Sequence, residues 1–70
     1  MAEITRNFTP AEIRRMLNLT IDDLAKEFGI SRMTLIRRES GESDWKASEI
    51  KWLSDRSEIP IERITYRNSF

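Results

Sequence analysis

The sequence predicts an all-α protein, a compact bundle of about five short helices in a single domain. Signals for the start of a helix recur at Thr9, Thr20 and Ser31, each followed by apolar residues at helical spacing. Gly29 and Gly41 stand where two of these helices should end. The chain has 70 residues, which is the size of one domain with a small core.

The first helix is expected at residues 10–17. The segment TPAE at 9–12 is a capping box with proline at the first helical position. Phe8 and Ile13 fit the hydrophobic staple around it. This helix should bury Ile13 and one or both of Met16 and Leu17, and it should turn Arg14 and Arg15 to solvent.

Residues 19–41 predict two helices joined by a tight turn. Thr20 caps the first of them, and acidic residues in its first turn suit the helix dipole. Gly29 can adopt the positive φ of a C-cap, and Ser31 opens the second helix, at 31–40. This arrangement is the helix-turn-helix motif, whose second helix normally lies in the DNA major groove. Its inward residues are expected to be Leu24, Ala25, Phe28, Ile30 and Leu35.

Two further helices complete the expected bundle. One is expected at residues 45–57, with Ile50 and Leu53 inward, and a short one at 60–66, with Ile61 and Ile64 packing back. Trp45 and Trp52 are seven apart, so they could share a face and serve packing or a dimer surface. Residues 1–8 are expected to form a flexible arm and residues 67–70 a tail.

The motif resembles the Cro/CI-type phage repressor helix-turn-helix family. The resemblance covers about residues 9–64, and in size the chain is also similar to modulators of repression of temperate phages. It implies a transcriptional regulator of a phage-type lysis/lysogeny switch. The residues that carry the resemblance are Thr20, Leu24, Ala25, Gly29, Ile30, Ser31, Leu35, Arg37, Glu39 and Gly41, with Leu53, Ile59, Ile61 and Ile64 in the closing segments.

By position, the resemblance assigns a phosphate anchor and a base-reading face. Ile21 stands at the anchor position, where the family commonly has glutamine, and isoleucine cannot hydrogen-bond a phosphate. Arg38 stands where the family prefers a large apolar residue, so its stem is expected to cover the core edge while its guanidinium reaches water. The residues on the base-reading side of the second motif helix are Arg32, Met33, Ile36 and Arg37.

The charge balance is unusual for a small DNA-binding protein. Twelve basic and twelve acidic residues cancel, whereas DNA affinity depends largely on Lys and Arg neutralising phosphates. Residues 31–40 hold three arginines against one glutamate. Acidic residues flank this stretch on both sides: Asp22, Asp23 and Glu27 before it, and Glu42 and Asp44 after it.

Two interpretations therefore compete for the same face. In one, a Cro-like repressor reads operator DNA, with arginines on guanine and with Met33 or Ile36 on thymine methyl groups. In the other, which we favour, Ile21, Met33 and Ile36 form an apolar patch that docks on a partner repressor and blocks its DNA binding. Asp22 and its acidic neighbours would then pair with the basic surface of that repressor. Met33 or Ile36 half-buried against the fourth helix is the structural alternative.

Composition argues against other classes of function. The chain has no histidine and no cysteine, so the commonest general base, thiolate nucleophiles and Cys/His zinc sites are missing. We expect no enzyme activity, cofactor, metal or small-molecule substrate. With no signal peptide and no apolar run of membrane length, a cytoplasmic protein without membrane contact is expected. A scaffold that forms homodimers through its tryptophans or its C-terminal residues is a third class.

Overall fold

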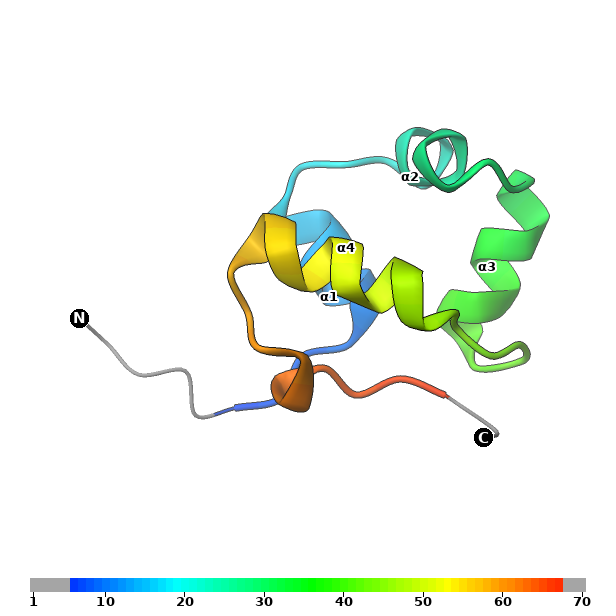
Figure 1. The fold of residues 1–70 in the computed structure, drawn as a ribbon. Coiled ribbons are helices and arrows are strands. Elements are labelled where there is room, and N and C mark those ends of the chain that lie inside the picture. The colour runs from blue at the N-terminus through cyan, green and yellow to red at the C-terminus, as the bar shows by residue number, and fades with distance from the viewer. Residues whose placement is uncertain (1–5, 68–70) are drawn as a thin grey trace.

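The computed structural model describes residues 6–67, and within this range it places four α-helices and one 3₁₀ turn (Figure 1). Helix α2 packs on α3, and α1 packs on α4. The all-helical class is confirmed, and the expected fifth helix is the 3₁₀ turn η1. The elements are α1 (Pro10–Met16), α2 (Ile21–Phe28), α3 (Arg32–Ser40), α4 (Ala47–Ser57) and η1 (Ile61–Arg63).

The helix starts are those that the sequence predicts. Thr9 and Thr20 form capping boxes with Glu12 and Asp23, respectively, three residues further on. The Ser31 hydroxyl accepts a hydrogen bond from the backbone N–H of Thr34 at 3.1 Å. Each of these side chains satisfies a donor that a helix start leaves without an intrahelical partner, so three helices begin where local chemistry is most favourable.

Among residues 6–67, one apolar core joins the four α-helices. In this core, Leu24 and Ala25 of α2 pack with Leu35 of α3 and with the inward residues of α1 and α4. Trp45, which precedes α4, is also buried there. Five of the core side chains are essentially inaccessible to water, which is the main source of stability for a chain of this size. The core residues are Ile13, Leu24, Ala25, Leu35, Trp45, Ile50, Leu53, Ile59 and Ile64.

The C-terminal segment differs from the expected helix at 60–66. After η1 the backbone becomes extended at Ile64, which forms an isolated parallel bridge with Phe8. The Phe8 N–H donates to the Arg63 carbonyl, and the Thr65 N–H donates to the Phe8 carbonyl, both at 2.8 Å. This pairing ends η1 after a single 3₁₀ turn. It also leaves Ile61, which was expected to pack inward, 43% exposed.

The same pairing shortens the expected N-terminal arm. Phe8 is held in the bridge, and the Arg6 guanidinium lies 4.0 Å from the centre of its ring. Residues 1–5 of the arm and 68–70 of the tail lie outside the described range. Arg67, the first residue of the expected tail, accepts a hydrogen bond from the Trp45 N–H through its carbonyl. Trp45 therefore precedes α4, which begins two residues later than expected.

Helix α1 is rotated relative to the sequence expectation. Its inward stripe runs through Pro10, Ile13, Arg14 and Leu17, which are spaced as one face of a helix. Met16 falls outside this stripe and is 55% exposed, so of the two residues expected to join Ile13 in the core, Met16 is the one that does not. Leu17 takes its place and packs against the edge of the core.

Candidate functional site

The turn between α2 and α3 fixes the relative placement of these two helices. Gly29 ends α2 in the left-handed region at φ 68°, a conformation that costs glycine little. The backbone N–H of Ile30 returns to the Ala25 carbonyl at 3.0 Å, and the chain then enters α3 at Ser31. Figure 1 shows α3 at one end of the molecule, crossing α2. The helix-turn-helix motif is thus present as predicted.

Two helix surfaces carry the six residues predicted for the site, which we call the helix-turn-helix face. Met33 stands out from it with 54% of its surface exposed, whereas Ile21 and Ile36 are half-buried. Ile21 packs against the edge of the core, which limits how much of it a partner could reach. The face consists of Ile21 and Asp22 from α2 and Arg32, Met33, Ile36 and Arg37 from α3.

The two exposed arginines of this face each lie against a carboxylate. Arg32 Nη1 is 3.0 Å from Asp22 Oδ1, an ion pair that ties the start of α3 to the start of α2. Arg37 Nε is 4.0 Å from Glu42 Oε2, in the loop that follows α3. All four side chains remain more than half exposed, so the pairs are solvated and can exchange partners.

Asp23 is adjacent to Asp22 but has a different role. Its carboxylate accepts a hydrogen bond from the Thr20 backbone N–H at 3.0 Å. That hydrogen bond is the main reason why the pKa of Asp23 lies below its ordinary value. The carboxylate is thus engaged in capping α2, which leaves Asp22 to face α3.

The other arginines near the motif point inward, which corrects two expectations. Arg14 is buried and its Nε is 2.7 Å from Glu39 Oε2, so it joins α1 to α3 instead of facing solvent. The guanidinium of Arg38 is not in water: its Nη1 donates to Glu49 Oε2, and both side chains are about nine-tenths buried. Both acidic partners are distant in sequence or on another helix, so no local pattern revealed the pairs.

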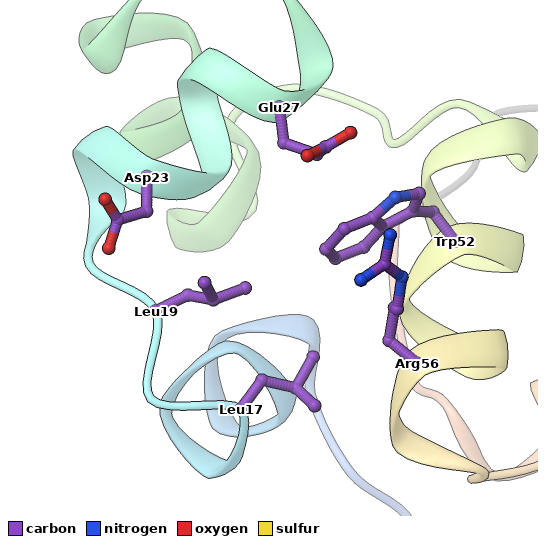
Figure 2. Close-up of a pocket in the computed structure, with 6 residues that line it drawn as sticks. All are labelled: Leu17, Leu19, Asp23, Glu27, Trp52 and Arg56. Atoms are coloured by element: carbon purple, nitrogen blue, oxygen red, sulfur yellow. The ribbon is translucent and has the colours of Figure 1, made fainter.

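A shallow groove lies beside the motif but is separate from it (Figure 2). It has a volume of about 300 Å³ and lies between the α1–α2 connection, α2 and α4. The Arg56 guanidinium covers the Trp52 ring at 4.7 Å, and Trp52 also meets Phe28 edge to face. None of the six predicted site residues lines it. The lining residues are Leu17, Leu19, Asp23, Glu27, Trp52 and Arg56.

Residues 6–67 hold neither a cluster of metal-ligating side chains nor a membrane-spanning helix. No three His, Cys, Asp or Glu side chains in this range come together as metal ligands would. Over the same residues, every helix is too short and too polar to cross a bilayer.

Comparison with known proteins identifies the family. A family model described as helix-turn-helix, of the Xre/Cro/CI-like type, matches residues 11–51, from α1 into α4. This match spans more than half of the chain, and the chain belongs to the helix-turn-helix family of DNA-binding transcription regulators. No curated protein and no solved structure matches the chain. The matched range holds the whole helix-turn-helix face.

Proposed function

We propose that this protein is an antirepressor, or modulator, of a phage-type lysis/lysogeny switch. Its helix-turn-helix face docks on a partner repressor and blocks or modifies the binding of that repressor to DNA. The observation that carries the proposal is the state of this face: an exposed Met33 between two arginines that each lie against a carboxylate. An apolar centre with a rim of mixed charge is typical of protein interfaces.

Charge supports a protein partner over DNA. The chain has a formal net charge of zero, so it brings no overall attraction to phosphates. Arg14 and Arg38, which would add positive charge near the motif, are consumed by buried ion pairs. A repressor that grips its operator presents basic residues on its own recognition surface. The exposed carboxylates of Asp22 and Glu42 would pair with these basic residues.

The alternative is a Cro-like repressor that reads operator DNA with α3. Family membership supports it, since the family binds DNA through this helix. Arg32 and Arg37 are exposed and can leave their partners for guanine edges or phosphates. Specific binding to a fragment of the protein's own regulatory DNA, weakening steeply as salt rises, would favour this alternative.

The proposal is tested by Met33→Asp in a pull-down of the repressor encoded in the same switch. We expect the variant to lose the repressor, because a carboxylate would replace the apolar centre of the interface. The matched control is Met16→Asp, since Met16 is as exposed as Met33 but lies on α1, outside the face. Circular dichroism of both variants checks that helicity is kept. Equal retention of the repressor by both variants would contradict the proposal.

A further inference from the structure

Asp22 and Glu42 lie at the two places where the helix-turn-helix face would otherwise present a free arginine. We infer that these two carboxylates decide the class of partner: they exclude the DNA backbone, and their removal uncovers a latent affinity for DNA. The inference rests on the proposed function, because it explains how a member of a DNA-binding family comes to bind a protein instead of DNA.

The geometry places one carboxylate near each end of α3. Asp22, in the first turn of α2, reaches the first residue of α3, and the 3.0 Å contact is a charge-assisted hydrogen bond. Glu42 lies 4.0 Å from Arg37 Nε, just beyond the last turn of α3. Each carboxylate thus lies beside an arginine donor that a phosphate oxygen would need. A phosphate approaching either arginine meets a like charge well within the screening length of about 10 Å at moderate salt.

The third arginine of α3 offers no substitute. Arg38 is paired with Glu49 inside the molecule, so all three arginines of this helix face a carboxylate. The loop after α3 holds a further acid, Asp44, whose Oδ1 lies 3.2 Å from Arg67 Nε. Of the carboxylates that lie against the arginines of α3, Asp22 and Glu42 are the two that combine high exposure with contact to an outward arginine. They can therefore be neutralised without opening a buried pair.

The experiment compares two double variants that change the net charge equally. Asp22→Asn with Glu42→Gln removes both carboxylates of the face. Asp55→Asn with Glu62→Gln, on α4 and η1, removes two exposed carboxylates elsewhere. Each pair of substitutions raises the formal net charge from zero to +2. Fluorescence anisotropy measures binding to a labelled DNA duplex of mixed sequence at 50 and 200 mM salt, and circular dichroism checks helicity.

We expect the Asp22/Glu42 variant to bind the duplex at 50 mM salt at least about tenfold more tightly than the wild type and the control variant. Two added phosphate contacts should steepen the salt dependence, so that its affinity falls about tenfold more than theirs between 50 and 200 mM. Three results would overturn the inference: an equal gain in the control variant, no gain in a variant of unchanged helicity, or wild-type binding of the same strength.

The test is independent of the test of the proposed function. Repressor pull-down with Met33→Asp reports on the apolar centre, whereas the DNA titration uses no repressor. Failure of the DNA titration alone refutes the role of the two acids and leaves repressor docking in place. Failure of the pull-down alone refutes docking, whatever the duplex does.

Discussion

At the scale of the residue, Arg38 and Glu49 form a buried ion pair at a position where the family resemblance predicts an apolar side chain. The resemblance assigns a large apolar side chain to position 38, and the structure instead buries an arginine there against a carboxylate of α4. Glu49 Oε1 also accepts a hydrogen bond from the Lys46 backbone N–H at 2.9 Å, so it caps α4 as well. A buried ion pair of this kind adds little net stability, but removing one partner leaves an uncompensated charge.

We therefore predict that substituting Arg38 alone destabilises the fold, and that a second substitution, at Glu49, restores most of the lost stability. Arg38→Ile should lower the free energy of unfolding by about 3 kcal/mol, because Glu49 would remain buried without its cation. Adding Glu49→Gln should recover most of the loss, since glutamine keeps the hydrogen bond to Lys46 without a charge. Urea unfolding of the wild type, the two single variants and the double variant measures these changes. Additive losses in the double variant would show that the pair is not coupled.

At the scale of the element, the capping boxes make α1 and α2 sensitive to acid. The pKa of Glu12 lies below its ordinary value of 4.5, and that of Asp23 below 3.8, first because each carboxylate accepts a backbone N–H at its helix start. A carboxyl with a lowered pKa in the folded state stabilises the fold above its unfolded pKa. This contribution is lost as the pH falls through the lowered value.

The thermal midpoint should accordingly fall as the pH drops below about 4.5, the ordinary value for Glu12, and should keep falling past 3.8, that for Asp23. A Glu12→Gln/Asp23→Asn variant should melt at a lower temperature than the wild type at pH 7, with a smaller difference at pH 3, because the wild type progressively loses its charged caps as the pH falls. Thermal scans by circular dichroism at the two pH values measure this. A difference that is the same at both would mean that capping by these carboxylates depends little on their charge.

At the scale of the whole molecule, the segment before α1 is paired with the segment after η1. Phe8 and Ile64 form the bridge, and the segment after Ile64 reaches the start of α4, where the Trp45 N–H donates to the Arg67 carbonyl. Ile64 is buried in the common core, so the pairing belongs to the cooperative structure and not to a loose terminus.

Native-state hydrogen exchange should detect the backbone pairing between Phe8 and the segment around Ile64. The amides of Phe8 and Thr65 should exchange much more slowly than in an unfolded chain, because both donate to backbone carbonyls at 2.8 Å. Ile64→Ala should abolish that protection and should lower the free energy of unfolding by about 2–5 kcal/mol, the usual cost of truncating a buried isoleucine. If both amides of the wild type exchanged as fast as in an unfolded chain, the pairing would be contradicted.

Much of the fold followed from local chemistry that the sequence states directly. The starts of α1, α2 and α3 depend on capping side chains within three residues, and Gly29 and Gly41 both take the left-handed conformation expected at helix ends. The inward residues of the motif, Leu24, Ala25 and Leu35, were predictable from helical periodicity. The same periodicity predicted an outward Met33, which the structure exposes.

Contacts between distant segments decided the rest. The rotation of α1 that buries Arg14 and exposes Met16 depends on Glu39, 25 residues further on. The end of η1 depends on pairing with Phe8, and the burial of Arg38 depends on Glu49. The sequence by itself determined where α1, α2 and α3 begin and that Met33 of the motif points outward, because those choices are made within a few residues. Only the tertiary structure decided which charged side chains are buried and which carboxylates lie against the arginines of the helix-turn-helix face, because an ion pair forms wherever the fold brings its partners together.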